Sequence, residues 1–277
     1  IYTLSLHDAL PIFGRVPSFY DVPWKGSAAA VGAQESLAGA VAAGGRICPT
    51  QHIGDGGGLG VPEYLEEAVR LQMELTGCVP QIVAEDLHPG YANRRFARRL
   101  AEECGAELID VQHHWAHAAS LMVDRGDVEH IAAIAVDGTG HGDDGMAWGG
   151  EVLSCGFDSY RRCAHLQYIP LLGSERALHD LRRLRFAIDE MNGEENSSFG
   201  EGEAEVLRRL MAKSVGASSF GRVLDAIAYS AGVCERRTYD GEPAMKLEPL
   251  LARGRLIDGF GTGTSNGVIE KIGRAHV

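Results

Sequence analysis

The sequence lacks the features that mark several large classes of protein. No apolar run approaches the roughly 20 residues of a membrane-spanning helix, so no membrane partner is expected. The six cysteines form no C-x-x-C pair, which excludes the usual zinc-finger spacing, and their scatter is typical of reduced thiols in a cytoplasmic protein. The 26 lysines and arginines face 38 aspartates and glutamates, a net charge of -12, which argues against a nucleic-acid partner.

Two histidines form the first candidate site. His113 and His117 lie four residues apart, so in a helix both imidazoles project from one face. Imidazole suits zinc and iron, and such an ion would need at least one further ligand. The zinc-protease motif H-E-x-x-H is absent, because His114 stands where that motif places its glutamate base. The other interpretation is a pair of structural histidines on a helix surface or in a core.

An aspartate and a series of glycines form the second candidate site. Residues 131–136 are a continuous apolar run, which predicts a strand buried on both faces. Asp137 follows directly, at the carboxyl end of this strand, which is where ligands bind in open α/β sheets. It is either a metal ligand or a turn residue before Gly138. The following glycines predict a loop that phosphate can approach closely, or a plain hairpin. They are Gly138, Gly140, Gly142, Gly145, Gly149 and Gly150.

Strands and helices alternate along the first half of the chain, which predicts an α/β fold with a mainly parallel sheet. Strands are expected at residues 46–53, 81–86, 107–112, 146–157 and 162–171. Helices are expected at residues 61–76, 91–104, 175–192, 200–214, 222–232 and 242–253, besides the histidine helix. In the helix at 61–76 one apolar face is predicted, made of Val61, Tyr64, Leu65, Ala68, Leu71 and Leu75.

The two ends of the chain differ from the rest. Residues 1–13 have neither the basic segment nor the cleavage site of a signal peptide, and they resemble translated sequencing-adapter reads. Residues 269–277 have the same character. We expect both segments to be non-native and the chain to be a gene fragment.

Several motifs follow one another in a fixed order: PTQHIGD (49–55), EDLHPGY (85–91), VQHHWAH (111–117), VDGTGHGDDGMAWGGE (136–151), SSFGRVLDA (218–226) and YDGEPAMKLE (239–248). Together they closely resemble the carboxy-terminal domain of the hydrogenase-maturation carbamoyltransferase family HypF. The resemblance extends from about residue 30 to residue 252.

The resemblance implies a fold and an activity. The fold is the two-lobed actin/sugar-kinase type, with a first α/β lobe at 14–160 and a helix-rich second lobe at 161–268. The second lobe is expected to be incomplete, because the family's later aspartate motif is missing from this sequence. The activity is transfer of a carbamoyl group from carbamoyl-adenylate, made with ATP, to the C-terminal cysteine of a HypE-like acceptor protein.

The resemblance also implies roles for single residues. The metal, zinc or iron, is held by His113, His117 and Asp137, and Asp137 and His88 are the catalytic candidates. His88 orients the carbamoyl group or contacts a ligand of the metal, or else it is a hydrogen-bonded turn histidine. The nucleotide and its phosphates are bound by Gly138, Thr139, Gly140, Gly142, Gly221, Asp225 and Glu242.

Two alternatives remain open on the sequence. An O-carbamoyltransferase that acts on a small-molecule hydroxyl shares the same core motifs, and neighbouring hydrogenase-maturation genes would argue against it. A non-catalytic module that binds nucleotide and metal is the second alternative, and nucleotide binding without turnover would select it.

Overall fold

The computed structural model describes residues 18–126, 129–196, 198–254 and 263–269. The chain divides into two compact units, Ile1–His130 and Ile131–Val277. This division falls just before the strand at residue 131, whereas the lobe boundary implied by the family resemblance lies after residue 160. Both terminal segments predicted to be non-native lie outside the described residues, apart from Ile269.

The first unit contains a six-stranded sheet in the order β1-β4-β3-β2-β5-β6. Its strands are β1 (Tyr20–Asp21), β2 (Ala28–Ala30), β3 (Ala40–Ala43), β4 (Arg46–Pro49), β5 (Ile82–Asp86) and β6 (Glu107–Val111). Only the pairs β2–β5 and β5–β6 are parallel, and the other three pairs are antiparallel, so the prediction of a mainly parallel sheet was wrong. A tight turn joins β3 to β4 through Gly44 and Gly45, both at positive φ, and so short a connection permits only antiparallel pairing.

Two helices, α2 (Val61–Thr76) and α3 (Arg94–Cys104), pack on the sheet of the first unit. The bounds of α2 are those predicted, and Gly77 ends the helix in the left-handed conformation. Its predicted apolar face was only partly right: Leu65 and Ala68 are buried, while Leu71 is 54% exposed and Leu75 67%. The apolar residues occur on two sides of this helix, and only the packing against the sheet decides which side is buried.

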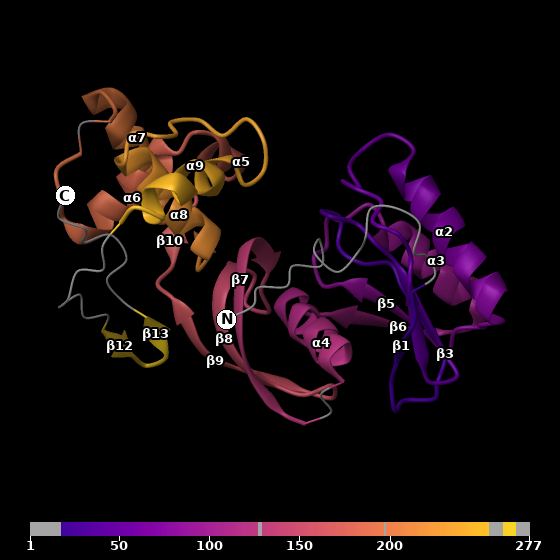
Figure 1. Ribbon diagram of the computed structural model, residues 1–277. Helices are drawn as coiled ribbons and strands as arrows, with labels where there is room; N and C mark the ends of the chain where they lie inside the picture. Colours follow the sequence, from indigo (N-terminus) through magenta and orange to yellow (C-terminus); the bar gives the residue numbers. More distant parts are fainter. Residues whose placement is uncertain (1–17, 127–128, 197, 255–262, 270–277) are drawn as a thin grey trace. The chain divides into compact units, whose positions relative to one another are not determined.

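The third helix of this unit, α4 (His113–Arg125), follows β6 after a single residue. Gln112 caps it, because its side-chain oxygen accepts a hydrogen bond from the backbone N–H of Trp115 at 2.9 Å. Figure 1 shows α4 on the opposite side of the sheet from α2 and α3. The first residue of α4 therefore lies at the carboxyl end of β6.

The second unit is built on a seven-stranded mixed sheet in which β8 is central. Its strands are β7 (Ile131–His141), β8 (Ala147–Cys155), β9 (Tyr160–Leu166), β10 (Ile169–Pro170), β11 (Gly216–Ala217), β12 (Thr264–Ser265) and β13 (Val268–Ile269). The apolar run at 131–136 does form a strand, but it pairs antiparallel with β8 and is not buried on both faces, since Ile134 is 78% exposed. Continuous apolar sequence was therefore a poor guide to burial here.

Helices of the second unit enclose its hydrophobic core. They are α5 (Glu175–His179), α6 (Arg182–Asn192), α7 (Glu201–Met211), α8 (Phe220–Ser230) and α9 (Glu242–Leu251), which gather together in Figure 1. Phe186 is fully buried and meets Phe199 edge to face at 5.6 Å between ring centres. The single helix predicted at 175–192 is in fact two, because Asp180 leaves the helical conformation and forms a β-bridge with Arg236. None of the helices described is long and apolar enough to cross a bilayer.

Candidate metal and phosphate sites

The histidine pair lies at the start of α4, in the first unit. The Nε2 atoms of His113 and His117 are 3.1 Å apart, which confirms the prediction that the two imidazoles share a helix face. His113 is largely buried, with 14% of its side chain exposed, whereas His117 is exposed.

A carboxylate that was not among the predicted site residues holds the first of these histidines. The Oδ2 atom of Asp86 lies 2.8 Å from Nδ1 of His113, and its Oδ1 atom accepts a hydrogen bond from the backbone N–H of His88 at 2.8 Å. Burial by itself would raise the pKa of Asp86, but these hydrogen bonds outweigh it and hold the pKa below its usual value. The signal was present in the sequence, because Asp86 ends a predicted strand that neighbours the strand before His113.

The geometry of the pair fits a tetrahedral divalent ion. Zinc–nitrogen bonds of about 2.0–2.1 Å at a tetrahedral angle separate two ligand nitrogens by about 3.3 Å. The two Nε2 atoms, 3.1 Å apart, need almost no movement to reach that separation. Imidazole nitrogens with a carboxylate behind one of them are the donor set and support that zinc and iron sites use.

Two further histidines near the pair have local structural contacts. The ring of His88 stacks on Tyr91 at 4.2 Å, and its Nδ1 accepts a hydrogen bond from the backbone N–H of Gly90 at 3.1 Å. These contacts are those of a turn histidine, so a catalytic role for His88 stays a proposal. His114 is fully buried, with Nδ1 at 3.3 Å from Nε2 of Gln112, as expected of a core residue.

Asp137, in the second unit, does not end its strand as predicted. β7 continues to His141, and its register with β8 shifts between Val136 and Gly140, so Asp137 sits at a β-bulge. The Oδ1 atom of Asp137 accepts a hydrogen bond from the backbone N–H of Gly138 at 2.6 Å, and the Thr139 hydroxyl donates to the Gly138 carbonyl at 2.5 Å. Two of the groups expected to bind phosphate are thus engaged locally.

The glycine-rich segment is a hairpin rather than an open loop. Gly142 donates its backbone N–H to the Met146 carbonyl at 2.9 Å, and a side chain on Gly142 would collide with the Trp148 indole. Asp144 accepts hydrogen bonds from Trp148 Nε1 at 2.9 Å and from the Tyr168 hydroxyl at 2.6 Å. The structure therefore assigns Gly142 and Asp144 to holding the turn, and a phosphate contact by Gly142 stays a proposal.

The N-terminus of α8 packs directly against the bulge at Gly138. A Cβ on Gly221 would lie 3.0 Å from the Gly138 Cα, so the two backbones approach closely here and a side chain would have to push them apart slightly. Ser219 caps the helix by accepting from the backbone N–H of Arg222 at 3.1 Å, and its hydroxyl donates to the Asp137 carbonyl at 3.1 Å. Gly138 and Gly221 are thus brought together beside a helix N-terminus, where anions are favoured.

A buried ion pair lies behind Gly138, and only its acidic member was among the predicted site residues. Arg222 Nη1 lies 3.1 Å from Asp225 Oδ2, and each side chain is only 5% exposed. Burial lowers the pKa of Arg222 and raises the pKa of Asp225. The Arg222 Nη2 atom would lie 3.5 Å from a Cβ on Gly138, so a positive charge is placed at the bulge.

Glu242, the last predicted nucleotide ligand, is engaged at the start of α9. Its Oε2 atom accepts hydrogen bonds from the backbone N–H of Thr238 at 2.6 Å and from the Thr238 hydroxyl at 2.9 Å. Its Oε1 atom lies 2.7 Å from Lys246 Nζ. Both carboxylate oxygens serve the local structure, and a contact with nucleotide stays a proposal.

These contacts predict how stability depends on pH. Lys246 and the hydrogen bonds from Thr238 lower the pKa of Glu242 to about 2, against about 4.3 in an unfolded chain. A depressed carboxylate pKa contributes stability above about pH 4.3, and this contribution is lost as pH falls toward 2. We expect Glu242→Gln to be less stable than the wild type at neutral pH and to lose less stability between pH 5 and 2.

Urea unfolding at several pH values measures this difference. Glu248→Gln is the matched control, since Glu248 is an exposed carboxylate on the same helix. The assignment is wrong if Glu242→Gln and Glu248→Gln give the same dependence on pH.

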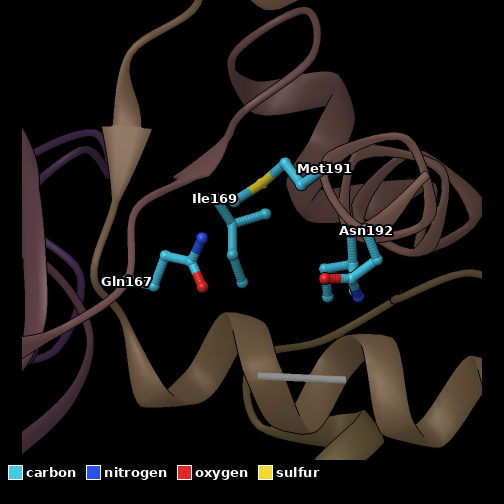
Figure 2. A pocket seen from close by; sticks show the side chains of 5 residues that line it. Gln167, Ile169, Met191 and Asn192 are labelled. Carbon is cyan, nitrogen blue, oxygen red and sulfur yellow. The ribbon is translucent and has the colours of Figure 1, made fainter. Parts of the chain in front are cut away.

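Figure 2 shows a small pocket elsewhere in the second unit, between β10 and α6. It is lined by Gln167, Ile169, Ile188, Met191 and Asn192. None of the candidate site residues contributes to it, so it is no part of the sites above.

Two family models match the chain. Residues 25–124 match the HypF Kae1-like domain, and residues 133–271 match the second subdomain of the carbamoyltransferase Kae1-like domain. Fold and sequence thus define a mixed α/β domain of the Kae1-like carbamoyltransferase class. The chain belongs to the HypF family.

Individual relatives support the same membership. The chain is 38% identical to carbamoyltransferase HypF2 of Cupriavidus necator, over 73% of this chain and 26% of the relative. It is 36% identical to the probable carbamoyltransferase HypF of Methanocaldococcus jannaschii, over 74% of this chain and 28% of that relative. The chain therefore spans about a quarter of the length of these relatives.

Solved structures of the family have the same fold. A full-length HypF in the phosphate- and nucleotide-bound form superimposes with a TM-score of 0.82 at 31% identity, covering 92% of this chain and 34% of that one. HypF of T. kodakarensis superimposes with a TM-score of 0.80 at 34% identity, covering 92% of this chain and 36% of that one.

Proposed function

We propose that this chain is the carbamoyl-transfer domain of a HypF-type enzyme of hydrogenase maturation, working in the cytoplasm on carbamoyl-adenylate made with ATP. The observation that carries the proposal is the imidazole pair of His113 and His117, whose Nε2 atoms meet at 3.1 Å within a chain of this family. The six free cysteines suit a reducing compartment. The units Ile1–His130 and Ile131–Val277 would be the two lobes of an actin/sugar-kinase-like fold.

The proposed metal site consists of His113, His117 and Asp137. Imidazole and carboxylate ligands fit zinc or iron. When bound, such an ion offsets phosphate charge and polarises the carbamoyl carbonyl as a Lewis acid.

The proposed nucleotide site lies in the second unit. A bound anion would lie close to the backbone of Gly138 and Gly221 and to the N-terminus of α8. The guanidinium of Arg222 adds positive charge there. Thr139, Gly140, Gly142, Asp225 and Glu242 complete the proposed set. The related full-length HypF was solved with phosphate and nucleotide bound, which supports this part of the proposal.

The proposed reaction is a single acyl transfer. The thiolate of the C-terminal cysteine of a HypE-like acceptor attacks the carbamoyl carbon of carbamoyl-adenylate. A carbon–sulfur bond forms, the bond between the carbamoyl carbon and the phosphate oxygen breaks, and AMP leaves with the electron pair. His88 would orient the carbamoyl group.

Metal content and nucleotide affinity of the full chain test the proposal. We expect stoichiometric zinc or iron in the wild type and none in the double variant His113→Ala/His117→Ala. Affinity for AMP, measured by calorimetry, should fall at least about tenfold in the double variant, about 1.4 kcal/mol, because phosphate loses a counter-charge.

His130→Ala is the control, because His130 is exposed and belongs to neither α4 nor a proposed site. It should keep both metal and AMP. If the wild type holds no metal and binds AMP no better than the double variant, the histidine pair is structural and the proposed function is wrong.

A further inference from the structure

The topology of the first unit places one carboxylate against the proposed metal pair. β5 and β6 run parallel, and their register sets Asp86 opposite Val111. α4 begins two residues after Val111, so the imidazole of His113 emerges at the sheet edge where the Asp86 carboxylate ends β5. Strand pairing alone therefore brings together two residues that lie 27 positions apart.

The two oxygens of Asp86 make separate contacts. Oδ1 accepts the backbone N–H of His88 at 2.8 Å, and Oδ2 lies 2.8 Å from His113 Nδ1. Only 6% of the Asp86 side chain is exposed. Because a backbone N–H can only donate, Oδ1 is fixed as an acceptor and the orientation of the whole carboxylate is fixed with it.

The backbone of Asp86 is held as firmly as its side chain. Arg94, the first residue of α3, donates from Nη1 to the Asp86 carbonyl. The same guanidinium lies 2.8 Å from the carboxylates of Glu85 and Asp110. Several charged contacts therefore fix the end of β5 from which the Asp86 carboxylate projects.

These contacts determine which nitrogen of His113 carries the proton. An ionised carboxylate only accepts hydrogen bonds, so Nδ1 of His113 must be the donor. In a neutral imidazole the other nitrogen, Nε2, then presents its lone pair. Nε2 is the atom that faces His117 Nε2 at 3.1 Å.

We propose that Asp86 is a positioning residue that holds His113 in the one tautomer able to bind a metal through Nε2. The inference rests on the proposed metal site and adds a residue to it. Carboxylates behind ligating histidines fix ring orientation and tautomer in this way, and their loss typically costs about 10–100-fold in metal affinity.

The substitution Asp86→Asn tests the tautomer directly. Its carbonyl oxygen would keep accepting from His88 N–H, which turns the amide NH₂ toward His113 Nδ1. Nδ1 must then accept, and the proton moves to Nε2, where it blocks the metal. Asp86→Ala leaves both tautomers open to His113. We therefore expect Asp86→Asn to lose zinc affinity by about 10–100-fold or more, at least as much as Asp86→Ala.

Zinc affinity is measured on the full chain by competition with a chromophoric chelator. Asp124→Asn is the control, because it removes the same charge from an exposed position of α4. A purely structural role for Asp86 predicts the reverse order, with the conservative Asn variant milder than Ala. A milder loss for Asp86→Asn than for Asp86→Ala, or unchanged zinc affinity in both variants, overturns the inference about Asp86. The proposed function still stands in that case, provided that the wild type binds metal.

A second measurement needs no metal. The ¹⁵N shifts of the imidazoles in metal-free protein, recorded near pH 8 and so above the usual histidine pKa of about 6.5, report the tautomer. We expect Nδ1–H for His113 in the wild type and Nε2–H in Asp86→Asn. The same tautomer in both overturns the inference. A wild type with the expected tautomer that binds no zinc disproves the metal site, and with it the role given to Asp86.

Discussion

Replacing Arg162 with alanine is expected to lower the free energy of unfolding of the second unit by about 3–5 kcal/mol, the usual result of breaking a buried ion pair from one side. Glu151, in β8, is fully buried, and its Oε2 atom lies 2.7 Å from Arg162 Nε. The guanidinium also lies 3.9 Å above the Trp148 ring and donates to the Ser218 hydroxyl at 3.1 Å. Alanine would leave the buried Glu151 carboxylate without its counter-ion.

Urea unfolding followed by tryptophan fluorescence measures this effect, because Trp148 is buried in the same unit. Arg161→Ala is the matched control, because it removes the neighbouring arginine, whose side chain is exposed. It should change the free energy of unfolding by less than about 0.5 kcal/mol. The double variant Glu151→Gln/Arg162→Met should recover much of the loss, since no uncompensated charge remains. Equal losses for Arg161→Ala and Arg162→Ala would contradict the assignment.

Gly150→Ala is expected to destabilise the second unit by about 1–3 kcal/mol through overpacking. A Cβ at this position would lie 2.5 Å from the Ser218 carbonyl oxygen and 2.5 Å from the Leu166 Cδ1 atom. A backbone oxygen cannot move aside as a side chain can, so β8 and the segment before α8 must separate. Because Ser218 also hydrogen-bonds Glu151, the separation weakens the buried ion pair as well.

Gly138→Ala is the comparison for this prediction. The nearest neighbour of its Cβ would be Arg222 Nη2, at 3.5 Å, an ordinary contact. Gly138→Ala should therefore keep the stability of the wild type while Gly150→Ala loses it, as measured by urea unfolding. Similar stabilities for the two variants would show that the close packing at Gly150 is not needed.

The sequence pattern predicted correctly those features of the structure that depend on residues close together in the chain. The helix at 61–76 has the predicted bounds because Pro62 near its start and Gly77 at its end are local signals. The facing imidazoles of His113 and His117 follow in the same way from the repeat of one helical turn. Such features need no knowledge of what packs against them.

Pairing between distant segments was not predictable in that way. The run at 131–136 is apolar throughout, yet β7 is antiparallel to β8 and exposes Ile134, and the bulge that carries Asp137 exists only because β8 is its partner. The buried side of α2 likewise depends on the sheet beneath it. Hydrophobic composition limits these arrangements but does not choose among them.

The sequence by itself determined the family, the α/β class, the histidine helix and the candidate ligands, because these reside in motifs and local spacing. Only the tertiary structure decided that Asp86 faces His113, that Arg222 stands behind Gly138 and that the glycine segment is a hairpin. The physical reason is that hydrogen bonds and ion pairs join atoms that are close in space. The parallel register of β5 with β6, which brings Asp86 to His113, is a choice of partner that no single segment encodes.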